Sequence, residues 1–261
     1  YEQIGVLLNP IFLQEKRGKM SVQFTYHGGM CVEIVRSDGY RILIDPYLTE
    51  NPLTEKRPED FADVNLILVT HYAFDHYGDA PAIMQMEKAE LLCGTDTYLH
   101  FCAAHPDLAK RAKKTIYGDC KTYGETIVRC IRAFHVSRGA IHETPVFGPP
   151  LGFVIQVEKG VSFYHTGDTC LFGDMKLLRE LYHPEIMCVG ISRIKAESSC
   201  EMTPREAAMA ASWVGSQVVI PTHYVQGSPD LREFCRHMQS FAPDAAIKSK
   251  VGSTFSFTPA Q

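Results

Sequence analysis

Two histidines and an aspartate fall within six residues of one another in residues 70–79, directly after the apolar, strand-like run 64–69. They are His71, Asp75 and His76. A strand that stops and turns into a helix leaves its last side chains in a shared crevice, where neutral imidazoles and a carboxylate suit a divalent metal ion. For this segment alone, a solvated loop in which two histidines lie close by chance is an equal alternative.

Three later strand-like runs also end at a histidine or an aspartate. The pairs are residues 127–134 with His135, residues 160–166 with Asp168, and residues 218–222 with His223. Taken singly, Asp168 reads as an ordinary turn residue after Gly167. Taken together, four strand ends that each carry a ligand-type side chain predict a metal centre at a sheet edge, because the loops of α/β enzymes carry their chemistry.

The order and spacing of several blocks resemble the metallo-β-lactamase superfamily, and more narrowly its metal-dependent hydrolases related to L-ascorbate-6-phosphate lactonase. The resemblance covers about residues 21–258 and rests on residues 41–48, 70–79, 133–135, 164–175 and 219–224. It implies an α/β fold of the αββα type, in which two mixed sheets are flanked by helices. Periodicity alone predicts only the α/β class.

The resemblance also implies two metal positions that share one aspartate. The first position would be held by His71, His135 and Asp168, and the second by Asp75, His76, His223 and the same Asp168. The family pattern is His-x-His-x-Asp-His, and Ala73 stands at its second histidine. The first position therefore loses an imidazole, although zinc sites often work with three protein ligands. A mononuclear or unequally loaded site is the favoured interpretation.

The chemistry follows from these ligands. A divalent ion lowers the pKa of bound water to roughly 7, which provides a hydroxide that attacks an ester, lactone or phosphodiester. Asp75 is the candidate catalytic residue that orients or deprotonates this water, or it only holds the metal. His165 is a candidate for a residue that supports a metal ligand without binding the metal itself, with a buried structural role as the alternative. The mixed ligands suit one or two ions of zinc or manganese, with iron as a further option.

The substrate is less constrained. Loop-like segments after His135 and after residues 185–190 carry four basic side chains that suit a phosphate or carboxylate. These are Arg138, His142, Arg193 and Lys195, for which a solvated surface role is the alternative. We expect a metal-dependent hydrolase of a small anionic ester, lactone or phosphodiester metabolite. The alternative is a degenerate member that binds a ligand or partner without turnover; Ala73 favours it, and the six retained ligand-type residues oppose it.

Composition agrees with this expectation. The chain has 261 residues, 45% of them hydrophobic, which suffices for a single domain over residues 20–261. The net charge is −4 and the one basic block, residues 110–114, is typical of a solvated helix end, so nucleic acid is not an expected partner. Nine cysteines without a Cys-x-x-Cys pair favour reduced thiols and a cytoplasmic location.

Residues 1–19 are interpreted as an N-terminal extension that precedes Met20. Their apolar part, residues 4–13, is interrupted by Asn9 and Pro10 and is too short to span a bilayer, so no membrane anchor is expected. Its apolar character suggests docking on its own or a neighbouring subunit, and a homo-oligomer is expected.

Helix signals are clearest in the second half. Thr203, Pro204 and Glu206 form a capping box that predicts a helix through Trp213, ended by Gly215. Further helices are expected over residues 174–182 and 231–238. Near the start, where relatives read Gly-His-Ser, the chain has His27 before two glycines, and we interpret this histidine as a packed strand residue.

Overall fold

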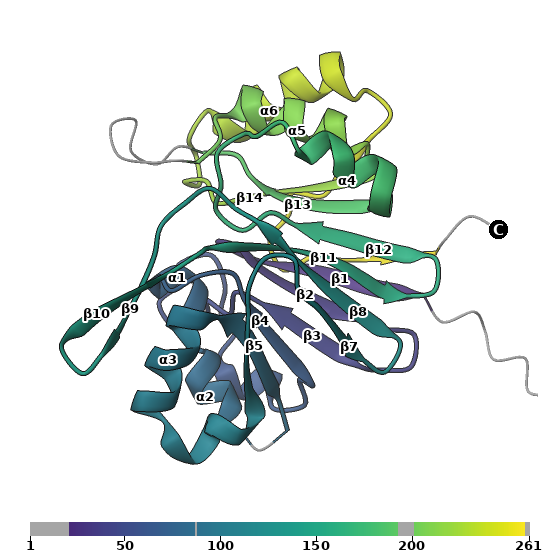
Figure 1. Cartoon of the computed structure of the whole chain (residues 1–261). Helices are drawn as coiled ribbons and strands as arrows, with labels where there is room; N and C mark the ends of the chain where they lie inside the picture. Colours follow the sequence, from purple (N-terminus) through teal and green to yellow (C-terminus); the bar gives the residue numbers. More distant parts are fainter. Residues whose placement is uncertain (1–20, 87, 193–200, 259–261) are drawn as a thin grey trace, which may run out of the picture.

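A computed structural model describes residues 21–86, 88–192 and 201–258 (Figure 1). The predictions for residues 1–19, Arg193 and Lys195 fall outside these ranges. The described chain forms two seven-stranded sheets that pack against each other, with helices on both outer sides. The predicted αββα sandwich of two mixed sheets is confirmed.

The first sheet joins the start of the chain to its end. Its strands, in spatial order, are β16 (Thr254–Phe257), β1 (Val22–Gly28), β2 (Cys31–Val35), β3 (Arg41–Ile44), β4 (Leu66–Val69), β5 (Glu90–Gly94) and β6 (Ala112–Thr115). Strands β16 to β3 pair antiparallel, and β3 to β6 pair parallel.

The second sheet uses the later part of the chain. Its strands are β15 (Ala246–Ile247), β14 (Val218–Thr222), β13 (Ile186–Gly190), β12 (Val161–His165), β11 (Leu151–Glu158), β8 (Thr126–Arg132) and β7 (Cys120–Tyr123). Strands β15 to β12 run parallel, and β12 to β7 alternate in direction. A separate hairpin of β9 (Ser137–Ile141) and β10 (Thr144–Gly148) projects beside helix α3 (Figure 1).

Helices cover the outer faces. The first sheet carries α1 (Phe74–Tyr77), α2 (Ala80–Met84), α3 (Thr95–Ala104) and the 3-10 helices η1 (Pro58–Phe61) and η2 (Pro106–Arg111), and the second carries α4 (Met175–Tyr182), α5 (Pro204–Val214) and α6 (Asp230–Phe241). The three predicted helices correspond to α4, α5 and α6. The predicted capping box is present, since the Thr203 hydroxyl accepts from Glu206 N, and Gly215 ends α5 at φ 74°.

The hydrophobic core has three layers because strand side chains alternate between two buried faces. In β3, Ile42 and Ile44 point into the layer between the sheets, while Leu43 points to the helices. The two sheets meet directly at Phe24 and Phe163, whose ring centroids are 5.6 Å apart. The two sheets therefore pack face to face through buried side chains.

Some local expectations need correction. The basic block 110–114 is only partly a helix end, because η2 stops at Arg111 and Lys113 and Lys114 lie on β6. His27 is a packed strand residue as predicted: it is buried in β1 and its Nε2 lies 3.0 Å from Glu33 Oε2. All eight cysteines in the described ranges are free thiols. No helix in these ranges has both the length and the apolar character needed to cross a membrane.

Candidate metal centre

The six side chains predicted as ligands lie at one edge of the sandwich. Strands β8, β12 and β14 run in the same direction, so their carboxyl ends meet there, and β4 of the other sheet ends opposite them. His71 follows β4, Asp75 and His76 lie on α1, His135 follows β8, Asp168 follows β12, and His223 follows β14. The sheets are joined here by backbone hydrogen bonds from Leu151 N to Thr70 O and from His223 N to Gly29 O.

Three of these residues form what we call the first cluster: His71, His135 and Asp168. Their candidate ligand atoms all lie within 4.8 Å of one another. His135 Nε2 is 3.8 Å from Asp168 Oδ2. His71 and Asp168 are buried, whereas His135 retains some solvent contact. The cluster has two imidazoles and one carboxylate, as the sequence predicted from Ala73.

The other three form the second cluster: Asp75, His76 and His223, again with candidate atoms within 4.8 Å of one another. His223 Nε2 lies 3.3 Å from Asp75 Oδ2, and His76 Nε2 lies 4.0 Å from Asp75 Oδ1. Asp168 reaches this cluster too, since its Oδ2 is 3.3 Å from His76 Nε2 and 3.5 Å from His223 Nε2. Asp168 thus lies between the two clusters.

Asp45, at the end of β3, supports the second cluster and was not among the predicted site residues. Its buried carboxylate accepts hydrogen bonds from Thr70 N and Thr70 Oγ1 and lies 2.8 Å from His76 Nδ1. That contact directs His76 Nε2 toward Asp168, as a metal-binding imidazole requires. Asp45 has φ 48°, an uncommon value for a residue other than glycine. The strand end before Pro46 was the available sequence signal.

Glu201 is a second site residue that the sequence reasoning missed. It is buried, and its Oε2 lies 3.8 Å from His223 Nδ1. Asp168, Glu201 and His223 form a third group whose candidate ligand atoms lie within 4.8 Å of one another. Glu201 therefore stands behind His223 much as Asp45 stands behind His76. Its position just before the capping box of α5 gave no local indication of this role.

His165 lies one step further from the clusters. It is buried in β12, where its Nε2 is 2.9 Å from Met30 O and its Nδ1 accepts from Gly167 N. It therefore contacts the backbone of Gly167, the residue before Asp168. The supporting role that the sequence suggested for His165 stays a prediction.

Electrostatics hold both carboxylates ionised. Burial alone would raise the pKa of Asp168, but the charges of His223 and His76 outweigh it and keep the pKa well below the usual range. Burial also opposes ionisation of Asp75, but the hydrogen bond from His223 lowers its pKa to about 2. Burial lowers the pKa of His71 to about 3. For His223, burial is outweighed chiefly by Asp168, so its pKa rises to about 9.

The donor set fits a divalent cation. His76 Nε2 and Asp168 Oδ1 are buried and form no hydrogen bond with any described residue. Buried polar atoms of this kind are costly unless a partner is supplied. Here four imidazoles and two carboxylates converge, which is the ligand chemistry of zinc, manganese or iron. The residues present therefore fit the metal that the resemblance implies.

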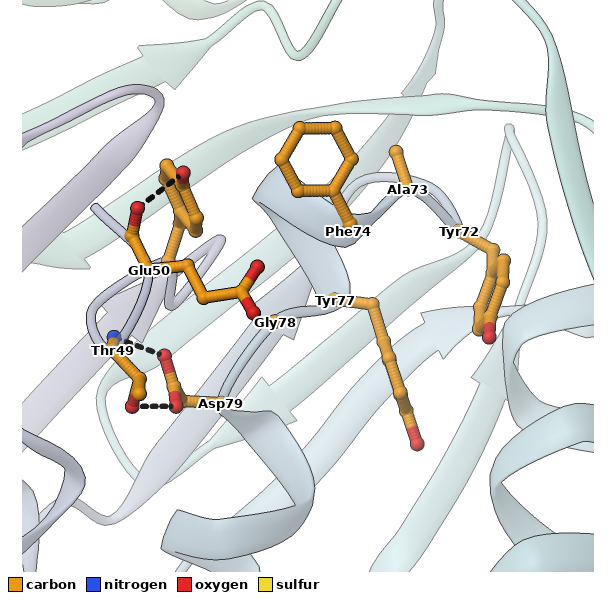
Figure 2. A pocket seen from close by; sticks show the side chains of 9 residues that line it. Thr49, Glu50, Tyr72, Ala73, Phe74, Tyr77, Gly78 and Asp79 are labelled. Carbon is orange, nitrogen blue, oxygen red and sulfur yellow. Dashed lines mark hydrogen bonds between the residues drawn. The ribbon is translucent and has the colours of Figure 1, made fainter. Parts of the chain in front are cut away.

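Ala73 lies between His71 and Asp75 and lines a pocket of about 390 Å³ (Figure 2). Of the predicted anion-binding residues, Arg138 and His142 are described, and neither lies in the lining of this pocket. Arg138 is on β9, not in a loop, and its guanidinium stacks 5.8 Å from the Phe147 ring centroid. His142 occupies the turn between β9 and β10 with φ 52°. Both belong to the projecting hairpin, and a role in substrate binding stays a prediction.

Comparison with known proteins agrees with this geometry. The model of the β-lactamase superfamily domain matches residues 40–224. A UPF0173 metal-dependent hydrolase from Rubrobacter xylanophilus is 32% identical over 242 residues, covering 90% of this chain and 95% of the relative. Another from Pyrococcus horikoshii is 34% identical over 220 residues, covering 83% and 91%.

Among solved structures, a metallo hydrolase from the archaeon Ignicoccus hospitalis aligns with a TM-score of 0.72 and 27% identity, covering 91% of this chain and 100% of that one. The matched region includes every described residue of both clusters. The chain belongs to the β-lactamase superfamily and, within it, to the UPF0173 family of metal-dependent hydrolases.

Proposed function

We propose that this protein is a metal-dependent hydrolase whose substrate is a small ester, lactone or phosphodiester. One observation carries the proposal: six ligand-type side chains from four separate segments of the chain converge on two clusters that share Asp168. The names of the relatives, which are metal-dependent hydrolases, support the same class. A divalent ion, when bound, would act as a Lewis acid and would make hydroxide available near neutral pH.

The protein's own residues have separable roles in this proposal. Asp168 would hold both positions, because its Oδ2 lies within 3.8 Å of His135, His76 and His223 nitrogens. Asp75 is the more exposed of the two carboxylates, and we assign it the role of orienting the attacking water. Asp45 would hold the His76 ring, and Glu201 the His223 ring, through their Nδ1 atoms.

A second candidate function is binding without turnover. Ala73 favours it, because the first cluster has one imidazole fewer than the pattern of its relatives. The second cluster argues against it, since Asp168 and the three ionisable side chains of this cluster, all but Asp75 buried, cost stability unless a cation compensates them.

The experiment that separates these candidates begins with elemental analysis of protein purified without added metal, which gives metal identity and stoichiometry. The same sample is then assayed with lactones, phosphodiesters and carboxylic esters in the presence of zinc, manganese or iron. We expect bound metal and turnover of at least one small compound. Bound metal with no turnover of any class would favour the binding role, and turnover confined to long RNA or DNA would contradict the proposed substrate size.

A further inference from the structure

The pocket beside Ala73 has walls of aromatic rings. Tyr47, Tyr72, Phe74 and Tyr77 line it, together with Thr49, Glu50, Ala73, Gly78 and Asp79 (Figure 2). Phe74 is 71% exposed and meets the Tyr47 ring edge-on, with centroids 5.8 Å apart. Tyr72 and Tyr77 form a second aromatic pair with centroids 5.1 Å apart. A volume of about 390 Å³ lies within the range of small-molecule sites.

The charge of this pocket is negative. Among the described residues that line it, the acids are Glu50 and Asp79, and there is no lysine or arginine. Asp79 is occupied structurally, because its carboxylate accepts hydrogen bonds from Leu48 N, Thr49 N and Thr49 Oγ1. Glu50 contacts Tyr47 only through its backbone oxygen, and its carboxylate forms no hydrogen bond or ion pair with any described residue. Figure 2 shows this side chain extending toward Gly78 and helix α1.

The pocket adjoins the second cluster. Its lining residues Tyr72, Ala73 and Phe74 are the three residues between His71 and Asp75. Burial, and next the charge of Asp75, raise the pKa of the Tyr47 hydroxyl above its usual range, so this ring lies within the electrostatic reach of that carboxylate. A small substrate with its reacting group at the clusters therefore has this pocket next to it.

We propose that this pocket, named here the Tyr47 pocket, binds an organic ammonium group on the non-reacting end of the substrate. The inference rests on the proposed function and narrows it to esters, lactones or phosphodiesters that carry a substituted ammonium. Aromatic faces attract weakly hydrated cations, and an unpaired carboxylate adds charge complementarity. An anionic group in the same place would meet Glu50 and Asp79 without a compensating cation among the described lining residues.

The ammonium assignment changes the substrate predicted from sequence, because the reacting group and the rest of the molecule would carry different charges. An anionic reacting group remains compatible with cations held at the clusters. The remainder of the substrate would be positive, so the complete molecule would be a cation or a zwitterion and not a simple anion. The basic residues described on the hairpin, Arg138 and His142, do not line the Tyr47 pocket.

The test is a binding titration that needs no turnover. Choline and its uncharged isostere 3,3-dimethylbutan-1-ol are titrated separately into isotopically labelled protein, and backbone amide shifts are followed by NMR at constant ionic strength. Choline should bind in the millimolar range and shift the amides of Tyr47, Glu50 and Gly78. The isostere should bind about two- to five-fold more weakly, because it lacks the cation–π attraction. Equal binding of both compounds would show that the pocket recognises apolar groups and would overturn the proposal.

Variants locate the effect. Glu50→Gln should weaken choline binding at least about two-fold, as expected for loss of an exposed charge pair. Phe74→Leu should weaken it about two- to five-fold. Glu59→Gln removes the same charge from exposed η1 outside the pocket and should leave binding unchanged. If choline affinity falls equally in the Glu50 and Glu59 variants, the net charge of the protein, and not the pocket, would explain the weaker binding. Inorganic phosphate shifting the same amides more strongly than choline would also overturn the proposal.

The result is independent of the proposed catalysis. If choline binds but no ester is hydrolysed, the assignment of the Tyr47 pocket as an ammonium site stands and only the proposed hydrolase activity is refuted. If hydrolysis is found, Glu50→Gln should raise KM for a choline ester about two-fold or more and leave kcat within error. The same variant should not change KM for the 3,3-dimethylbutyl ester. Hydrolysis with equal KM changes for both esters would overturn the ammonium assignment while the hydrolase proposal stands.

Discussion

The two clusters of the candidate metal centre share Asp168 but differ in how their imidazoles are supported. In the second cluster, His76 Nδ1 contacts the buried Asp45 carboxylate at 2.8 Å, and His223 Nδ1 faces Glu201 at 3.8 Å. In the first cluster, His71 Nδ1 lies 3.1 Å from the neutral Thr70 hydroxyl. His135 Nδ1 and His223 Nδ1 are both buried without a hydrogen bond to any described residue, but His223 Nδ1 has the Glu201 carboxylate nearby.

The cluster that lacks one imidazole of the family pattern is therefore also the cluster whose imidazoles have no carboxylate contact at Nδ1 among the described residues. The first cluster lacks an imidazole at Ala73, and no described carboxylate lies within hydrogen-bond distance of the Nδ1 atom of either of its histidines. In the second cluster a carboxylate faces each imidazole; the 2.8 Å contact from Asp45 orients the His76 ring, and negative charge beside an imidazole raises its basicity. We therefore expect unequal affinity, with the second cluster holding its ion more tightly.

The largest expected effect is that of Asp168→Ala. Because this carboxylate lies between the clusters, its loss should remove metal from both positions and abolish hydrolysis. Metal content per chain, measured by mass spectrometry after dialysis, checks this result. Asp244→Ala, at an exposed site remote from the clusters, is the matched control and should retain metal. Full metal content in the Asp168 variant would refute the ligand assignment.

Restoring the missing imidazole sharpens the comparison. Dialysis of the unmodified protein against a mild chelator should leave about one tightly held ion per chain, and Ala73→His should raise occupancy toward two. Ala73 lines the Tyr47 pocket of about 390 Å³, so open space borders the position of the new side chain. Two equally tight ions in the unmodified protein would contradict the unequal-site interpretation, since another group would then replace the histidine.

The supporting carboxylates give a smaller effect. Glu201→Leu should weaken metal binding about 10- to 100-fold, because His223 would lose the carboxylate that faces its Nδ1 at 3.8 Å. Glu201→Gln keeps an oxygen acceptor and should retain most of the affinity. Competition with a coloured chelator measures the metal affinity of both variants. Glu180→Gln, on the exposed side of α4, is the control. Unchanged affinity in the Leu variant would show that Glu201 does not support His223.

The smallest expected effect is on the pH dependence of thermal stability. In metal-stripped protein the pKa of His223 is raised to about 9, so its stabilising contribution is complete below about pH 6.5 and is lost as pH rises toward 9. Metal binding should strengthen over the same interval, because protons then compete less for the imidazole. The gap in Tm between loaded and stripped protein should therefore widen from about pH 6.5 to 9. His223→Gln should flatten the stripped curve; a gap that narrows with pH would contradict this account.

Much of the fold could be predicted because its signals are local. The capping box at Thr203 specifies the start of α5, and the apolar runs before His71 and His223 specify β4 and β14. Strand limits were less accurate: β4 begins at Leu66 and β8 stops at Arg132, since the pairing partners decide where a ladder ends.

Sequence alone was enough to predict the α/β class, the helices of the second half and six ligand-type residues, because residue type and strand-end position express these directly. Only the tertiary structure decided which nitrogen of each imidazole faces the centre and which carboxylate stands behind it. Asp45 and Glu201 reach His76 and His223 across 31 and 22 positions, respectively, so no local spacing reports them. The Tyr47 pocket likewise exists only because the segment after β3 packs against α1.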